Sequence, residues 1–112
     1  MIAEATENWP QVSVDYNEGL TVDYARRVGI STAVRGLRAV TDFEHEFSMA
    51  LTNRSLWPDF DTVFLMTRVD YMYLSSSVVR QVAQLGGDVS QFVQASIEQR
   101  LKEKVAQIDR SA

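Results

Sequence analysis

The sequence contains no cysteine and only one histidine, and these shortages narrow the chemistry open to it. Without thiols, the chain can form no disulfide, carries no thiolate nucleophile and offers no thiolate metal ligand. His45 stands between Glu44 and Glu46 and lacks the further ligands that a metal site needs. We therefore expect an exposed helix residue at position 45, and a protein suited to the reducing cytoplasm.

Long apolar runs and an excess of positive charge are also missing. No stretch is apolar enough to span a bilayer, and residues 1–7 lack the basic and apolar regions of a secretory signal. The formal net charge of -4 argues against a general nucleic-acid binder. Neither a Gly-x-Gly-x-x-Gly loop nor a Walker loop occurs. We expect no membrane or nucleic-acid partner, and anionic ligands would be held by a few placed arginines.

What is present is the composition of one soluble globular domain of 112 residues, 46% hydrophobic and 23% charged. Apolar periodicity predicts strands at 11–15, 32–34 and 62–66. It predicts helices at 2–8, 20–28, 41–55 and 77–85, and a last helix on which Ile97, Leu101, Val105 and Ile108 align. The Thr41–Glu44 spacing is that of a capping box. Because strands and helices alternate, the sequence predicts the α/β class, a parallel sheet with flanking helices.

A serine-rich loop follows the third predicted strand. If Ser75 or Ser76 caps the next helix, the first amides of that helix point outward and form an anion site. Arg80 lies one turn further on, and its side chain leans toward the helix N-terminus. The alternative is ordinary helix capping, which is the better interpretation of this loop taken alone.

A second loop, residues 35–38, is predicted after the strand at 32–34. Gly36 lets the backbone approach a ligand closely, and the two arginines can grip different parts of one extended anion. The alternative, equally supported, is a pair of solvated arginines near the acidic residues of 42–46. Carboxyl ends of parallel strands open on one rim, so the arginine and serine loops together predict a phosphate-rich ligand.

Five stretches in order and at the expected spacing resemble bacterial phosphopantetheine adenylyltransferases, members of the nucleotidyltransferase superfamily. They are RGLRAVTDFEHEF (35–47), MALTNRSL (49–56), VFLM (63–66), LSSS (74–77) and LGGDVS (85–90). The resemblance runs nearly end to end. It implies a Rossmann-like nucleotidyltransferase fold, a parallel sheet with flanking helices.

The resemblance also implies a reaction: adenylyl transfer from ATP to 4′-phosphopantetheine, giving dephospho-coenzyme A and pyrophosphate, with Mg²⁺ assisting. No protein nucleophile is needed, so catalysis is positioning and charge stabilisation. Arg35 would contact phosphopantetheine, with Thr21 near its pantetheine arm. The ATP-binding residues implied are Gly36, Leu37, Arg38, Glu46, Tyr71, Met72, Tyr73, Leu74, Ser75, Ser76, Ser77 and Arg80. A homo-oligomer and coenzyme A as a feedback ligand are further implications.

The sequence departs from the family pattern at several positions. Thr21 replaces a usually apolar residue, Met72 stands where serine is common, and His45 stands where tyrosine is common. Arg80 and Gln81 replace a usual lysine–glutamate pair, so the basic group is kept and the acidic one is lost.

The family begins with a strand and a Thr/His-x-Gly-His loop that this sequence does not contain, followed by a helix and a second strand. We therefore expect a single, N-terminally truncated nucleotidyltransferase domain over 1–112, without a catalytic residue of its own and inactive in isolation. With the first two strands missing, residues 12–15 should lie outside the sheet or shift beside 32–34. The alternatives are a non-catalytic nucleotide-binding or assembly module that needs a partner chain, and an unfolded fragment.

Overall fold

A computed structural model describes the backbone of residues 1–111, and their side chains except those of positions 40 and 41. The chain divides into two compact units. One unit, the sheet unit, consists of residues 16–73. The other, the helical unit, consists of residues 1–15 together with the chain from Leu74 onward.

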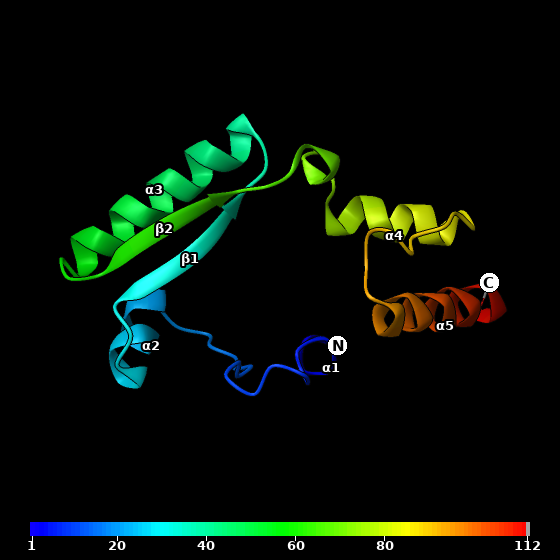
Figure 1. The fold of residues 1–112 in the computed structure, drawn as a ribbon, viewed down its shortest axis with the longest axis horizontal. Coiled ribbons are helices and arrows are strands. Elements are labelled where there is room, and N and C mark those ends of the chain that lie inside the picture. The colour runs from blue at the N-terminus through cyan, green and yellow to red at the C-terminus, as the bar shows by residue number, and fades with distance from the viewer. Residues whose placement is uncertain (112) are drawn as a thin grey trace. The chain divides into compact units, whose positions relative to one another are not determined.

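The sheet unit is built on two parallel strands, β1 (Thr32–Leu37) and β2 (Asp61–Met66), with Val34 opposite Val63. Helix α3 (Val40–Leu56) connects them and runs alongside both strands (Figure 1). This strand–helix–strand arrangement with parallel pairing confirms the predicted α/β class.

The first strand is longer than predicted, and the expected loop at 35–38 is wrong. Arg35, Gly36 and Leu37 belong to β1, and only Arg38 follows it. Strand β1 is longer because β2 offers backbone hydrogen-bond partners along its whole length. The pairing therefore continues as far as Leu37, which lies opposite Met66. The strand propensities of a glycine and two arginines do not reveal that this segment pairs with another strand.

The two faces of this sheet differ. Side chains alternate across a strand, and the face that carries Arg35 is turned toward α3, where Arg35 meets Glu46. The opposite face carries Val34, Val63 and Leu65, which are 64%, 46% and 59% exposed. Among the described side chains of this unit, these three are therefore only partly covered.

The hydrophobic core of the sheet unit lies beneath helix α2 (Thr21–Val28). Val22, Ala25 and Phe60 are buried there, and the Phe60 ring stacks on Trp57 with centroids 5.9 Å apart. Gly29 ends α2 in the left-handed conformation, with φ 74°, as the periodicity predicted. The apolar stripe of α2 thus holds the helix against the start of the sheet.

Helix α3 agrees with the predicted range 41–55, but it begins one residue earlier. Its N-cap is Ala39, so Thr41 is the second helical residue and the predicted capping box is misplaced. The side chain of Thr41 lies outside the described part of the chain.

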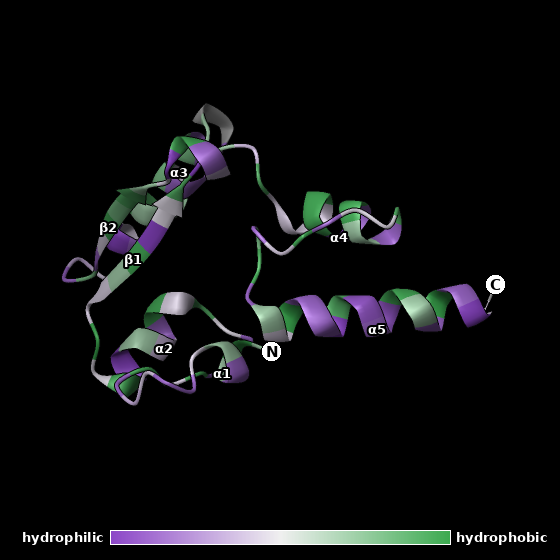
Figure 2. Ribbon diagram, turned by 45° about the vertical axis from the view of Figure 1, so that its right-hand side comes forward, coloured by the Kyte–Doolittle hydropathy of each residue, from purple (hydrophilic) through white to green (hydrophobic). Residues whose placement is uncertain are grey.

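The helical unit contains α1 (Ile2–Ala5), α4 (Ser76–Gln84) and α5 (Ala95–Ser111). Helix α1 ends three residues before the predicted limit, and Glu4 on it forms an ion pair with Arg100 of α5. Helices α4 and α5 pack against each other, and Figure 2 shows hydrophilic and hydrophobic residues alternating along α5. Among the described helices, none is long and apolar enough to cross a membrane.

Residues 11–15 form no strand, so the alternation of apolar and polar residues there was misleading. They lie outside the sheet, as expected if its neighbouring strands are missing from this chain. Val12 and Val14 remain 45% and 48% exposed. An alternating pattern forms a strand only where another strand offers backbone partners.

Candidate functional site

Two hollows in the sheet unit are lined by half of the residues predicted to bind ligands. The first, which we call the strand–helix cleft, lies between β1 and α3 and has a volume of about 50 Å³. Its lining residues are Thr21, Ala33, Arg35, Glu46, Met49, Ala50, Asn53 and Thr62. Thr21 and Arg35, the two residues predicted to contact phosphopantetheine, therefore line one cleft.

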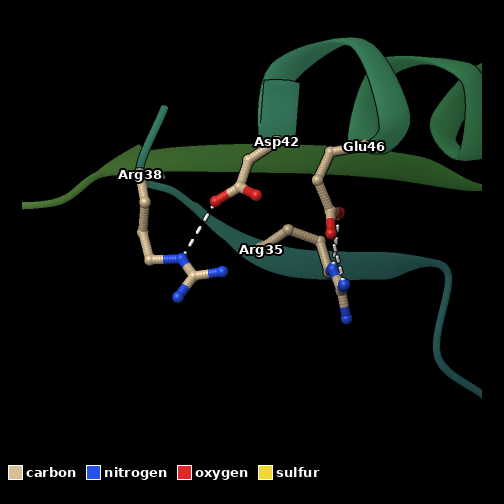
Figure 3. A network of polar contacts seen from close by, with 4 residues as sticks. All are labelled: Arg35, Arg38, Asp42 and Glu46. Atoms are coloured by element: carbon tan, nitrogen blue, oxygen red, sulfur yellow. Dashed lines mark hydrogen bonds and ion pairs between the residues drawn. The ribbon is translucent and has the colours of Figure 1, made fainter. Parts of the chain in front are cut away.

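Arg35 and Glu46 form a two-pronged ion pair inside this cleft (Figure 3). Arg35 Nε donates to Glu46 Oε2 at 2.7 Å, and Arg35 Nη2 donates to Glu46 Oε1 at 2.5 Å. The Glu46 side chain is only 12% exposed, whereas that of Arg35 is 49% exposed. The hydrogen bonds from Arg35 lower the pKa of Glu46, and those to Glu46 raise the pKa of Arg35. Both groups are therefore charged at neutral pH.

The second hollow, the rim cavity, opens at the carboxyl ends of β1 and β2 and has a volume of about 670 Å³. Its lining residues are Leu37, Arg38, Ala39, Phe43, Met66, Met72 and Tyr73. Leu37 and Met66 are paired in register, which is why both strand ends reach the same cavity. Four of the residues predicted to bind ATP, at positions 37, 38, 72 and 73, are thus brought together.

Arg38 stands at the mouth of the rim cavity and is also paired. Its Nε donates to Asp42 Oδ2 at 2.9 Å, four residues further along the chain (Figure 3). The alternative interpretation, a pair of solvated arginines near the acidic residues of 42–46, agrees with the structure in that both arginines pair with a carboxylate of the next helix. Although each arginine is paired with a carboxylate, Arg35 still lines the strand–helix cleft and Arg38 still lines the rim cavity.

Gly36 lies in β1 between the two arginines, and the space beside it is open. A Cβ added there would meet no atom within 4 Å. Packing among the described residues therefore does not require glycine at this position. Close approach of a ligand to the backbone is compatible with that open space.

The remaining predicted ATP residues are divided between the two units. Tyr71 ends a short 3-10 helix, Val69–Tyr71, in the sheet unit. The serine segment and Arg80 belong to the helical unit, whose chain resumes at Leu74. The convergence of Arg38 and Ser76 on one nucleotide therefore stays a prediction.

The N-terminus of α4 has the predicted local structure. Ser75 is the N-cap, and its Oγ accepts a hydrogen bond from the Val78 amide at 3.2 Å. Arg80 Nη2 donates to Ser77 Oγ at 3.5 Å, so its guanidinium leans back toward the start of the helix. Ordinary capping and an anion site share this geometry.

Sequence reasoning missed the other side chains of α3 that line the strand–helix cleft. Met49, Ala50 and Asn53 lie three, four and seven residues after Glu46. Those spacings place them on one helix face, so the signal was present in the sequence. It becomes specific only once Glu46 is known to face the sheet.

Comparison with known proteins agrees with the α/β fold. The sequence model of the cytidylyltransferase-like family matches residues 1–82. A phosphopantetheine adenylyltransferase of Caldanaerobacter subterraneus is 50% identical over 104 residues, which are 93% of this chain and 65% of that protein. One from Anaeromyxobacter sp. (strain K) is 49% identical over 111 residues, 99% of this chain and 68% of that protein.

A third relative of the same name, from Paraburkholderia xenovorans, is 50% identical over 106 residues, 95% of this chain and 62% of that protein. The chain thus spans about two thirds of the length of the curated relatives it matches. Identity at this level, over nearly all of the chain, extends across both compact units. The chain belongs to the phosphopantetheine adenylyltransferase family, within the cytidylyltransferase-like nucleotidyltransferases.

Proposed function

We propose that this chain serves adenylyl transfer from ATP to 4′-phosphopantetheine, which yields dephospho-coenzyme A and pyrophosphate. The relatives' name supports the reaction. The observation that carries the assignment to this chain is the strand–helix cleft, where Thr21 and Arg35 lie together. The Arg35 guanidinium in this cleft is the kind of group that binds a phosphate, and the Asn53 amide beside it can hydrogen-bond an amide of the ligand.

In the proposed reaction an oxygen of the 4′-phosphate attacks the α-phosphorus of ATP. The bond from that phosphorus to its bridging oxygen breaks, and pyrophosphate leaves with the electron pair. Arg35 holds the attacking phosphate, and Arg38 neutralises charge on the ATP phosphates. Their work is positioning and charge stabilisation, which phosphoryl-type transfers require most.

Mg²⁺ is proposed here as an ion carried by the ATP phosphates. Within the part of the chain that the structure describes, no group of three or more His, Asp or Glu side chains is placed to hold a metal. Glu46 and Asp42, the carboxylates nearest the two hollows, are each paired with an arginine. Magnesium commonly keeps several waters and binds through substrate phosphates, so we assign no step to a protein-held ion.

Calorimetric titration of the purified chain with each ligand separately tests the proposal. We expect Arg35→Ala to weaken 4′-phosphopantetheine binding about tenfold or more and to affect ATP less. Arg38→Ala should show the reverse preference. Arg54→Ala is the matched control, because Arg54 pairs with Asp61 outside both hollows. Failure of the wild-type chain to bind either ligand would contradict the proposal.

A second candidate function is a non-catalytic nucleotide-binding or assembly module that acts with a partner chain. The exposed sheet face with Val34, Val63 and Leu65 favours it, because parallel sheets are normally covered on both faces. Coenzyme A, which contains the pantetheine arm, is an expected competitor for the cleft in either case. Binding of ATP or coenzyme A without turnover favours the second function. Pyrophosphate release from ATP and 4′-phosphopantetheine favours the first, and it would overturn the expectation that the chain is inactive in isolation.

A further inference from the structure

In the Arg35–Glu46 pair, one edge of the guanidinium is bound to the carboxylate and another edge is left facing away from it. One edge, Nε with Nη2, is held by the two oxygens of Glu46. The other edge contains Nη1, which Figure 3 shows on the side of the guanidinium away from Glu46. A guanidinium offers its donors as flat forks, and a second fork can grip a phosphate while the first stays bound.

The pair is anchored at both ends, unlike most surface ion pairs. Arg35 stands in β1 opposite Phe64, so the ladder fixes its backbone. Glu46 stands in the second turn of α3, and its side chain is nearly buried at 12% exposure. The carboxylate of Asp42, which accepts from Arg38, is more exposed, at 30%. Arg35 is therefore held through two of its nitrogens by a carboxylate that is largely shielded from solvent.

We propose that Glu46 is a positioning residue: it fixes the Arg35 guanidinium so that its outer edge receives the phosphate of 4′-phosphopantetheine. The proposal rests on the function proposed above and departs from the expectation that Glu46 lies along ATP. In this proposal the Glu46 carboxylate acts by orienting Arg35, and it lies in the strand–helix cleft and not in the rim cavity. Fixing the arginine before the ligand arrives reduces the entropy lost on binding.

A positioning role and simple charge repulsion predict opposite changes in phosphate affinity when Glu46 is neutralised. A carboxylate close to an anion site repels the anion, so neutralising Glu46 would strengthen phosphate binding if charge alone mattered. If Glu46 positions Arg35, neutralising it weakens phosphate binding, because the guanidinium loses its fixed geometry. The two effects oppose each other, so the direction of the change identifies which one dominates.

The test is a double-mutant cycle measured by calorimetric titration with 4′-phosphopantetheine, with ATP titrated in parallel. We expect Glu46→Gln and Glu46→Asp each to weaken 4′-phosphopantetheine binding about tenfold and to leave ATP binding unchanged. Arg35→Lys should weaken it similarly, and Arg35→Lys with Glu46→Gln should be no weaker than Arg35→Lys alone. Glu44→Gln, an exposed residue on the same helix, is the matched control and should bind like wild type.

Each other outcome overturns the proposal. Tighter binding by Glu46→Gln would make Glu46 a competing anion, and additive losses in the cycle would make it a direct ligand contact. Loss of ATP binding alone would place it on the nucleotide. If the wild-type chain binds no 4′-phosphopantetheine, the proposed function falls and this inference with it. Circular dichroism of each variant separates these results from loss of folding.

Discussion

At the scale of single residues, Arg35 and Arg38 are held in different ways although they stand only three positions apart. Arg35 is bound by both oxygens of a glutamate whose side chain is 12% exposed, whereas the aspartate that accepts from Arg38 is 30% exposed. Charge-assisted bidentate pairs fix geometry as well as energy. We therefore expect the Arg35 guanidinium to keep one orientation.

The ion pair gives a prediction for the pH dependence of folding stability. Because the pKa of Glu46 is lower in the folded state, its stabilising effect is present above the ordinary glutamate pKa and is lost as pH falls through the lowered value. Near neutral pH we expect Glu46→Gln to unfold about 0.5–1 kcal/mol more easily than wild type. Urea unfolding at a series of pH values measures this difference.

Urea unfolding at the same series of pH values also provides the control for this prediction and can contradict it. Glu44→Gln, whose side chain is exposed, should match wild type throughout the range. A Glu46→Gln difference that stays constant down to strongly acidic pH would mean that the carboxylate charge contributes nothing to folding.

The sequence shows which charged residue types lie near one another along the chain, but not which of them are in contact. The two arginines and their two alternative environments were readable from residues 35–46. Which carboxylate each arginine meets depends on the register of β1 with β2 and on the rotation of α3, and both are set by packing. Asn53 shows the same limit, since its helical spacing from Glu46 was visible but its proximity to Arg35 was not.

At the scale of elements, the start of α4 depends on one hydroxyl. Ser75 Oγ accepts a hydrogen bond from the Val78 amide and so satisfies one of the unpaired donors at the helix end. We expect Ser75→Ala to lower the free energy of unfolding by about 1 kcal/mol, measured by urea titration followed by circular dichroism. Ser76→Ala, the same change one residue later at an exposed position, should cost less. Equal losses would show that Ser75 does not act as the cap.

The end of α4 depends on the absence of a side chain at Gly87. A Cβ there would stand 2.6 Å from Val82 Cγ1 and 3.1 Å from the Val82 carbonyl oxygen. We expect Gly87→Ala to destabilise the protein by about 1–3 kcal/mol through overpacking, measured by thermal unfolding. Gly19→Ala is the comparison, because its added Cβ would have no neighbour nearer than 3.9 Å. A Gly87→Ala protein as stable as Gly19→Ala would contradict this account of the turn.

Helices were predicted more accurately than strands. Helix α2 and the ends of α4 followed from apolar spacing and from glycines that stop a helix, which are local signals. Strand β1 exceeded its predicted end and residues 11–15 formed no strand, because strand formation depends on partners far along the chain. Local pattern cannot supply that information.

At the scale of the whole molecule, the buried core of the sheet unit is small and depends on Phe60. Phe60 is 2% exposed and packs with Val22, Ala25 and Trp57. We expect Phe60→Ala to cost about 3–5 kcal/mol, a large part of the stability of a typical domain. Tryptophan fluorescence during urea unfolding, measured in a Trp9→Phe background, reports the change through Trp57, because the Trp57 and Phe60 rings are stacked. Phe47→Ala, at a side chain already 48% exposed, should cost much less, and equal costs would contradict the assigned core.

The arrangement of the two hollows was partly predictable. Parallel strands ending at one edge implied a common rim, and the rim cavity confirms that for Leu37, Arg38, Met72 and Tyr73. The separate strand–helix cleft was not foreseen, because it requires the side of α3 that faces β1. The local sequence does not show which side of α3 faces β1, because that depends on how the helix packs on the sheet.

The most direct measurement of the central claim is a nuclear magnetic resonance titration of the isotopically labelled chain with 4′-phosphopantetheine. The account predicts that backbone amide signals of Thr21, Arg35 and Asn53, which share the strand–helix cleft, shift together and saturate. Shifts confined to the groove between α4 and α5, around Ala83 and Leu101, or no shifts at all, would contradict it.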